Sequence, residues 1–363
     1  MADSVAEQIA ALRDEDWGVR EDAATALGNF RDPRGARPLI NALRDSDRAV
    51  RTAATVALTA IGEPAMNDLG ACLRDPDLSV QEAAASILAT IADEHVVEPL
   101  ISALLNPNWV VRMHGAKALG RLKALQAVGT LILLLQDKVP AVRDESVAAL
   151  KAIGDAAVPS LVQSLKAPEW KVRLRATEAL GALSSASAVE PLLEILAHDP
   201  DIAIRQDAAR ALGEIGDPRA VEPLLQATGD SRLRAPAIEA LGKIGDRRAV
   251  PSLLAMIRNL NTADYEHRES PCQDDRYHKE LVPIEAAVRA LARIGDPKAL
   301  PVLVSALQTS LIRAEASEAL GAFGEPAVRL LVDRLKTETD DNIRTYIKEA
   351  LARLGWRPNR IRL

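Results

Sequence analysis

Residues 208–225 read AARALGEIGDPRAVEPLL, and this stretch joins the end of one predicted helix to the start of the next. Versions of it return along the whole chain: Val-Arg, two further residues, then an alanine-rich run that ends in Leu-Gly. Self-similarity at a period of roughly 20 to 50 residues indicates a repeat protein. The copies are 29 to 32 residues apart, except for one spacing of 50. The leucines of the eleven copies are Leu27, Leu58, Leu88, Leu119, Leu150, Leu180, Leu212, Leu241, Leu291, Leu320 and Leu351.

Each copy predicts two helices. In the first, of which residues 36–43 (ARPLINAL) are an example, apolar residues recur every three or four positions and a proline often stands near the start. The second, as in residues 19–28 (VREDAATALG), is rich in small residues that allow helices to approach closely. A glycine followed by an acid then ends the pair, and we expect that glycine to be a left-handed C-cap. These glycines are Gly154, Gly216, Gly245, Gly295 and Gly324.

Such helix pairs predict an all-α protein, because no single copy can bury its apolar face without a neighbour. Hydrophobic residues make up 48% of the chain and aromatic residues 2%, which suits closely packed helices better than a β-sandwich. We therefore expect an α-solenoid of about eleven helix pairs. It should form one domain over residues 1–354, with a loop insertion at 259–281 and a C-terminal tail at 355–363.

The chain resembles the HEAT repeats, specifically the HEAT-like subfamily named after phycobilisome lyases. The resemblance rests on residues 16–20 (DWGVR), 208–217 (AARALGEIGD) and 220–225 (AVEPLL), and it covers nearly the whole chain. It implies a right-handed superhelix whose Val-Arg helices line the concave side. It also implies an Asp–Arg ladder between repeats, which Gln81 and Ile284 would interrupt. The implied pairs are Asp16 with Arg20, Asp47 with Arg51, Asp201 with Arg205, Asp230 with Arg234, and Asp340 with Arg344.

Acidic residues predominate one, two and five positions after each ladder position, where we expect exposed side chains: twelve acids stand against four bases. This ratio favours a groove for a basic segment of another protein, although a solvated polar face is the alternative. Three tryptophans each stand three residues before a ladder position, and tryptophan is enriched in binding hot spots. Packing at the helix entry is the alternative for them. The candidate groove residues are Trp17, Trp109, His114, Asp144, Glu145, Trp170, Glu178 and Asp207.

The long spacing reflects an insertion in the ninth copy, where no apolar period runs and Pro271 would break a helix. Long loops in compact folds are usually functional, so we predict a partner-recognition loop; a solvated loop without a partner is the alternative. His267, Cys272 and His278 are weak candidates for a metal site, because their spacings do not match a zinc-finger frame. A metal-dependent enzyme that uses this loop is therefore a second alternative function. The candidate loop residues are Tyr265, His267, Cys272, Tyr277 and His278.

HEAT-like enzymes give two further comparisons. Deoxyhypusine hydroxylases hold two irons with His-Glu pairs directly after the ladder arginine, and this sequence contains no His-Glu pair, so that activity is not expected. A phycobilin lyase or lyase subunit is the first alternative function, and it would bring a bilin as cofactor. No residue set here maps onto a lyase motif one residue at a time. Under the preferred hypothesis we expect no cofactor.

Charge and apolar runs narrow the choice of partners. The net charge of −6 argues against a nucleic-acid partner, and the longest strongly apolar run, 130–135, is too short to cross a membrane. Two cysteines cannot build a disulfide framework and no signal peptide is expected at the start, so we predict a cytoplasmic protein. The predicted function is a protein-binding scaffold or assembly factor that uses the groove and the loop. The oligomeric state stays open.

Overall fold

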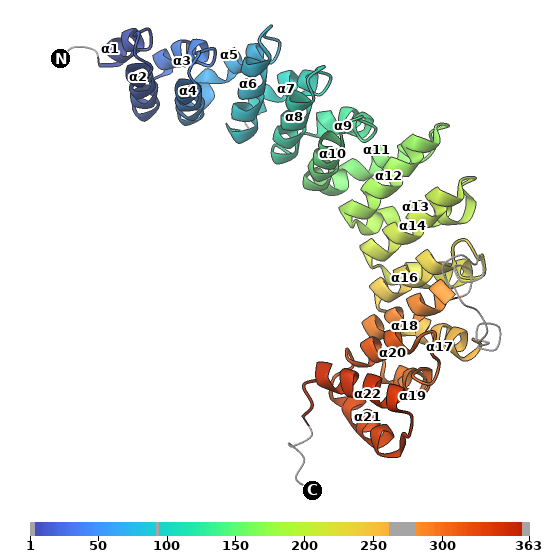
Figure 1. Ribbon diagram of the computed structural model, residues 1–363. Coiled ribbons are helices and arrows are strands. Elements are labelled where there is room, and N and C mark those ends of the chain that lie inside the picture. Colours follow the sequence, from blue (N-terminus) through green and yellow to red (C-terminus); the bar gives the residue numbers. More distant parts are fainter. Residues whose placement is uncertain (1–3, 92–93, 261–280, 358–363) are drawn as a thin grey trace. The chain divides into compact units, whose positions relative to one another are not determined.

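The computed structural model describes residues 4–91, 94–260 and 281–357, and the regular structure of these residues is entirely helical (Figure 1). Eleven pairs of α-helices follow one another from α1 to α22. This confirms the predicted α-solenoid of eleven helix pairs, whereas the right-handed superhelix stays a prediction. None of the described helices is long and apolar enough to cross a membrane.

The chain forms two compact units, unit 1 over Met1–Ser164 and unit 2 over Leu165–Leu363. The boundary falls between the two helices of the sixth pair. The first helices of unit 1 are α1 (Ser4–Ala11), α3 (Ala36–Ala42), α5 (Met66–Cys72), α7 (Val97–Ala103), α9 (Val128–Leu134) and α11 (Val158–Ser164). Its second helices are α2 (Trp17–Phe30), α4 (Arg48–Ile61), α6 (Leu78–Ile91), α8 (Trp109–Arg121) and α10 (Pro140–Ile153).

Unit 2 continues the same alternation of first and second helices. Its second helices are α12 (Trp170–Leu183), α14 (Ile202–Ile215), α16 (Arg234–Ile244), α18 (Val282–Ile294), α20 (Arg313–Leu320) and α22 (Asp341–Arg353). Its first helices are α13 (Val189–His198), α15 (Val221–Ala227), α17 (Val250–Arg258), α19 (Leu300–Ala306) and α21 (Glu325–Thr337).

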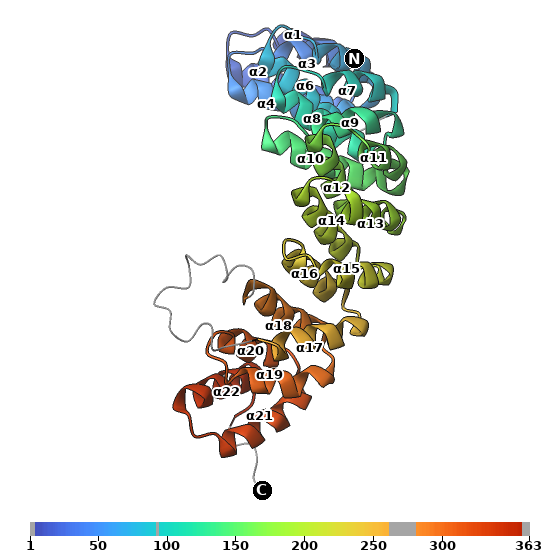
Figure 2. The same cartoon turned by 90° about the vertical axis from the view of Figure 1, so that its right-hand side faces the viewer.

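Within each unit the helices form two layers, because consecutive second helices pack on one another while the first helices cover their other side. Figure 2 shows the layers most plainly for α8 to α10 and for α13 to α16. The layers enclose a core of aliphatic side chains, such as the fully buried Leu27, Leu58 and Leu119. Cys72 is buried among them in α5, and burial is the main reason why the pKa of its thiol is raised.

The glycine of the Leu-Gly signature sets the distance between second helices. A Cβ atom on Gly28 would lie 2.7 Å from the Cα atom of Ala57, and one on Gly120 would lie 2.7 Å from the Cα atom of Ala149. Real Cβ atoms do not come this close to backbone, so these positions require glycine. The same contact recurs in unit 2 at Gly181, Gly213 and Gly242.

The predicted left-handed C-cap is found at some of the glycines that end a helix pair and not at others. Gly216 has φ 74° and ψ 14°, and Gly245 and Gly295 adopt the same left-handed C-cap. Gly154 and Gly324 also have positive φ, but their ψ values of −146° and −150° lie outside the left-handed helical region. A short 3-10 helix begins at Gly154 itself, and the helix α21 begins directly after Gly324.

Candidate protein-binding surface

A ladder of polar contacts fixes the start of the second helices and thereby the direction of the side chains around it. The ladder position is the fourth residue of a typical second helix, as Arg20 is in α2. The ladder positions are Arg20, Arg51, Gln81, Arg112, Arg143, Arg173, Arg205, Arg234, Ile284, Arg313 and Arg344.

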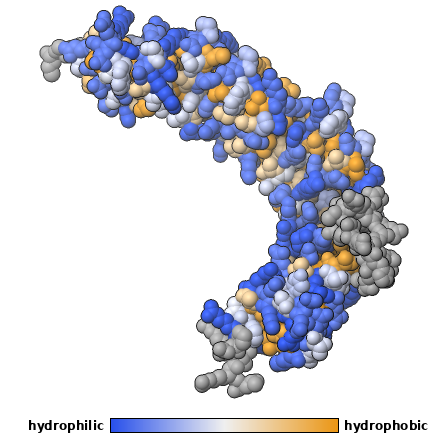
Figure 3. Space-filling model, viewed as in Figure 1, coloured by the Kyte–Doolittle hydropathy of each residue, from blue (hydrophilic) through white to orange (hydrophobic). Residues whose placement is uncertain are grey.

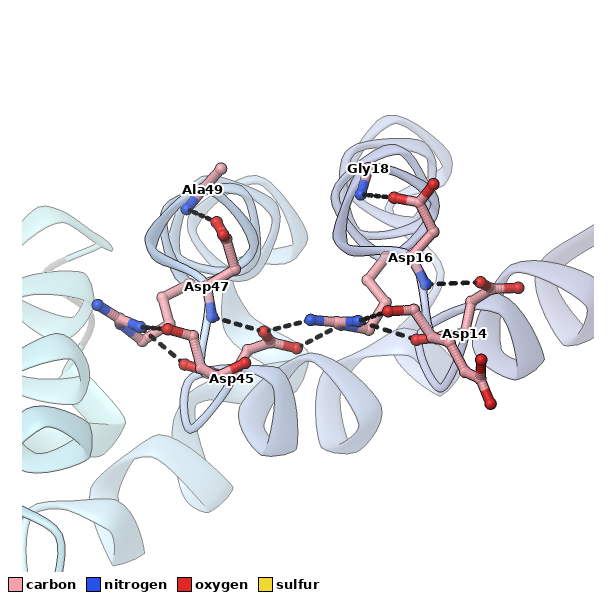
Figure 4. A network of polar contacts seen from close by, with 10 residues as sticks. Asp14, Asp16, Gly18, Asp45, Asp47 and Ala49 are labelled. Atoms are coloured by element: carbon pink, nitrogen blue, oxygen red, sulfur yellow. Dashed lines mark hydrogen bonds and ion pairs between the residues drawn. The ribbon is translucent and has the colours of Figure 1, made fainter.

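Arg20 shows the full geometry of a rung, and the turns that it joins carry Asp14 and Asp45, which are labelled in Figure 4. Its Nε donates to Oδ2 of Asp45 at 2.7 Å and its Nη2 donates to Oδ1 of the same carboxylate at 2.8 Å. Its Nη1 donates to the backbone carbonyls of Asp14 and Glu15. One guanidinium therefore joins the turn of its own repeat to the turn of the following repeat.

The acceptor of this rung differs from the predicted one. Asp47, which the sequence paired with Arg51, instead caps α4 by accepting the backbone N–H of Ala49 at 2.7 Å. Asp45 stands two residues earlier and accepts the N–H of Asp47 as well as the guanidinium of Arg20 (Figure 4). In this turn the first acid is thus the ladder acceptor and the second is the N-cap, and Asp199 and Asp201 divide the two roles in the same way. The same correction applies to Asp16, Asp201 and Asp340, which cap α2, α14 and α22.

Other rungs repeat or vary this pattern. Arg112 pairs with Asp137 at 2.7 Å and Arg173 pairs with Asp199 at 2.8 Å, in both cases with little solvent exposure. Asp230 is an exception, since it does not cap α16, whose N-cap is Leu233, and its carboxylate lies 3.9 Å from the guanidinium of Arg205.

Gln81 does not break the ladder, contrary to the prediction. Its Nε2 donates to the carbonyl of Asp75, and its Oε1 accepts from Nδ2 of Asn106 at 3.1 Å. The acceptor position of the next repeat holds an asparagine in place of an aspartate, so a neutral amide pair replaces the ion pair.

The fold favours the ionised form of two ladder carboxylates, Asp45 and Asp137. The hydrogen bonds from Arg20 are the main reason why the pKa of Asp45 is lowered. Burial by itself would raise the pKa of Asp137, but the hydrogen bond from Arg112 and the N–H of Val139 outweigh it, so this pKa is lowered too. These groups hold the repeats together, and their arginines are occupied by protein acceptors rather than turned to an anionic ligand.

Around the ladder lies the second-helix face, which we define as the side chains three residues before and one, two and five residues after each ladder position. In unit 1 it carries Glu21, Asp22, Glu82, Asp144 and Glu145. Glu82 accepts a hydrogen bond from Nδ2 of Asn108, whereas the other four form no ion pair within the described part of the chain. Two bases, Arg48 on α4 and Lys117 on α8, stand on the same face. The candidates Asp144 and Glu145 thus contribute to an acidic face.

The corresponding face of unit 2 is partly neutralised. Glu178 pairs with Arg175 at 2.6 Å, and Asp207 pairs with Arg210 on the same helix. Both were candidate groove residues, and the structure places each in an ion pair of its own helix. The acids of this face that have no ion pair among the described residues are Glu239, Glu315, Glu318, Asp341 and Glu349.

Each of the three candidate tryptophans is the first residue of a second helix and is exposed. Trp17 is 51% exposed on α2, Trp109 43% on α8 and Trp170 50% on α12. This exposure argues against a pure packing role at the helix entry. Trp170 differs from the others, because Nζ of Lys171 lies 5.7 Å from the centre of its ring.

His114 follows Trp109 on α8 and is half-buried. Burial foremost, and then the positive charge of Lys117, lower its pKa, so the imidazole is neutral at pH 7. Its Nδ1 is buried and has no hydrogen-bond partner among the residues that the structure describes. No group of three or more His, Cys, Asp or Glu side chains that could hold a metal ion occurs in residues 4–91, 94–260 or 281–357.

Sequence reasoning missed one feature of this face, an open groove of about 650 Å³ between α2 and α4. Its walls include Glu21, Gly28, Arg48, Ala57 and the side chain of Val56, which is 64% exposed. The sequence does contain a signal for this groove, because α4 carries no charged residue one, two or five positions after its ladder position.

The candidate loop residues Tyr265, His267, Cys272, Tyr277 and His278 lie outside the described residues.

Comparison with known proteins agrees with the fold. The sequence model of the family described as HEAT repeats matches residues 5–69, 66–151, 97–181, 158–235, 189–267 and 282–352. No curated protein matches the chain. The narrower resemblance to the phycobilisome-lyase subfamily stays a prediction.

Among solved structures, karyopherins have a similar fold. Kap121p bound to Nup53p superposes with a TM-score of 0.65 at 14% identity, over 98% of this chain and 45% of that one. Kap95p with RanGDP gives a TM-score of 0.58 at 15% identity, over 97% of this chain and 57% of that one. The chain therefore spans about half the length of these structures, and at such low identity the likeness concerns the fold.

Proposed function

We propose that this chain, which belongs to the HEAT repeat family, is a protein-binding scaffold or assembly factor that holds a basic segment of its partner on the second-helix face. The observation that carries this proposal is the face of unit 1. There Glu21, Asp22, Asp144 and Glu145 have no ion pair among the described residues, and the same helices and their neighbours expose Trp17 and Trp109.

The carboxylates and tryptophan rings of the second-helix face in unit 1 are spaced so that an extended segment of a partner can contact them in turn. Packed helices lie roughly 8–10 Å apart, so a segment that crosses α2 to α10 meets a new helix about every three residues of extended chain. Carboxylates spaced in this way steer a basic segment to the surface and set its register. Tryptophan rings add large contact areas at a low cost in side-chain entropy.

The solved relatives support this proposal by example. Structures of Kap121p exist with Nup53p, with Ste12p and with the extreme C-terminus of Cdc14p, so that related fold binds several proteins. The predicted recognition loop at 259–281 belongs to the same proposal as a second contact region. We further propose a cytoplasmic location, in which the buried thiol of Cys72 stays reduced.

A binding assay with a defined probe tests the proposal. The probe is a fluorescein-labelled peptide of twelve alternating lysines and serines, with a glutamine–serine peptide as the neutral reference. We expect the basic peptide to bind the intact chain and to weaken as salt is added. Replacing Glu21, Asp22, Asp144 and Glu145 by lysine should weaken binding about tenfold or more.

A matched control separates this face from net charge alone. Glu7, Glu15, Glu63 and Glu98 are exposed acids of unit 1 that lie off the second-helix face, in first helices and turns. Their replacement by lysine changes the net charge equally and should leave most of the affinity. Equal losses in the two variants, or equal binding of the basic and neutral peptides, would contradict the proposed function.

A further inference from the structure

The groove between α2 and α4 is an apolar site within an otherwise charged face. Its volume of about 650 Å³ lies within the range of ligand-binding clefts, roughly 300–1,000 Å³. Small side chains form much of its lining: Ala49, Ala53, Ala57 and Ala60 from α4 and Gly28 from α2. Figure 3 shows hydrophilic residues over most of the visible surface of each unit, with hydrophobic residues between them.

The groove exists because α4 differs from the other second helices. One, two and five residues after the ladder position, α4 carries Thr52, Ala53 and Val56. Each of the other ten second helices has at least one charged residue at these three positions. Long charged side chains there would cover the small residues beneath them. On α4 nothing covers them, and Val56 is left 64% exposed.

The depth of the groove is fixed by rigid contacts. Gly28 approaches Ala57 so closely that α2 and α4 cannot move nearer to each other. Rungs on both sides hold the starts of the two helices, since Arg20 of α2 binds Asp45, and Asp47 caps α4. A preformed apolar cleft of this kind binds with little loss of conformational entropy.

The charges near the groove identify the chemistry of its occupant. Glu21 is part of its wall, Asp22 follows on α2, and Glu82 stands on the other neighbour of α4, which is α6. Arg48 is the one base in the lining. Acids thus lie on both sides of an apolar centre.

We propose that this groove receives one bulky aliphatic or aromatic side chain from the basic segment of the protein partner, with basic residues of that segment on either side of it. This inference rests on the proposed function and adds the residue that sets specificity. The partner is then recognised by a basic–apolar–basic pattern and not by positive charge alone, because an apolar cleft rewards the buried side chain. Thr52 and Val56 are the specificity-determining residues.

The test compares the lysine–serine peptide with a version in which one central serine is replaced by leucine. We expect the leucine peptide to bind the intact chain about tenfold more tightly, as burial of a large part of one leucine side chain predicts. Val56→Asn should reduce this preference to about twofold or less while the lysine–serine peptide binds as before. Ala60→Leu, which fills the groove, should do the same.

Val56 and Ala60 are at least partly exposed, so neither variant should disturb folding, and circular dichroism checks this. Equal binding of the two peptides, with a loss on charge reversal, would overturn the groove assignment and leave the proposed function standing. Binding of neither peptide would overturn both. Self-association of the intact chain that Val56→Asn abolishes would show that a second copy occupies the groove, and would also overturn the assignment.

Discussion

The two units are built from the same repeat but present different surfaces. Of the eleven large hydrophobic side chains exposed in the described residues, nine belong to unit 1, and Trp170 and Leu330 belong to unit 2. On the second-helix face, three acids of unit 2 pair with bases of the same helix, as in Arg175–Glu178, whereas no acid of this face in unit 1 does so among the described residues. A HEAT repeat therefore fixes the packing and leaves the surface free to differ, and the proposed function places recognition on unit 1.

The ladder has two kinds of rung, and each unit contains both kinds. In unit 1, Arg20 and Arg112 each bind an aspartate of the next repeat. From Arg234 onward in unit 2, the described ladder arginines donate to carbonyls of their own repeat, as Arg313 does to Leu307 and Gln308. A ladder arginine that binds an aspartate of the next repeat links two repeats. A ladder arginine that donates only to carbonyls of its own repeat stabilises one turn.

The largest expected effect follows from this difference. Arg112→Met leaves the carboxylate of Asp137 buried without its partner, which should lower the free energy of unfolding by about 3 kcal/mol. Arg313→Met removes hydrogen bonds to backbone carbonyls and should lower it by about 1–2 kcal/mol. Urea unfolding followed by circular dichroism measures both. Equal losses would remove the distinction between the two kinds of rung.

The neutral pair Gln81–Asn106 suggests a sharper version of the same experiment. Combining Arg112→Gln with Asp137→Asn copies that pair into the next rung, and the double variant should be more stable than Arg112→Met. If the double variant is the less stable of the two, the amide pair at Gln81 does not replace an ion pair.

A second prediction concerns packing that the units share. Gly120→Ala in unit 1 and Gly213→Ala in unit 2 each place a Cβ atom under 3 Å from the backbone of the next helix, so each should lower stability by about 1–3 kcal/mol. Gly129→Ala is the matched control, because Gly129 lies in α9 with open space around it. That change should raise stability by roughly 0.5–1 kcal/mol. A large difference between Gly120→Ala and Gly213→Ala would show that the units are packed differently.

A third prediction uses pH to isolate one rung of unit 1. Because the fold lowers the pKa of Asp137, its contribution to stability is complete above the pKa of an unfolded aspartate, about 4, and is lost as the pH falls below it. The stability gap between the intact chain and Asp137→Asn should therefore narrow from pH 6 to pH 3. Unfolding midpoints measured across this range check it, and a gap that stays constant would contradict it.

The sequence predicted the helix pairs because their signal is repeated eleven times, and each copy confirms the others. It assigned the ladder acceptor wrongly because both acids of an Asp-x-Asp turn, such as Asp45 and Asp47, are plausible partners. Only the structure of the turn shows that the carboxylate of the second acid accepts the N-cap hydrogen bond. The neutral pair of Gln81 and Asn106 could have been predicted from the sequence, because Asn106 replaces the aspartate in the repeat that follows Gln81.

The candidate site was predicted less completely than the fold. The exposed position of Asp144 followed from helical spacing, whereas packing at the helix entry was still an alternative for Trp17 and Trp109. The ion pair of Glu178 could not be foreseen, because side-chain rotamers decide whether residues three apart on a helix meet. The groove beside Val56 was missed because a search for charges passes over a helix that has none.

The smallest expected effect separates the tryptophans of the two units. Trp109→Gln and Trp170→Gln should each change stability by less than about 0.5–1 kcal/mol, because both rings are largely exposed. Binding of the lysine–serine peptide should weaken about fivefold in Trp109→Gln, whose ring lies on the face that leaves Asp144 and Glu145 unpaired. It should weaken less than twofold in Trp170→Gln, because Lys171 already lies against that ring and repels a second cation. Fluorescence titrations give both constants. Equal losses would mean that the two units share the recognition of basic segments, and a loss confined to Trp170→Gln would move the site to unit 2.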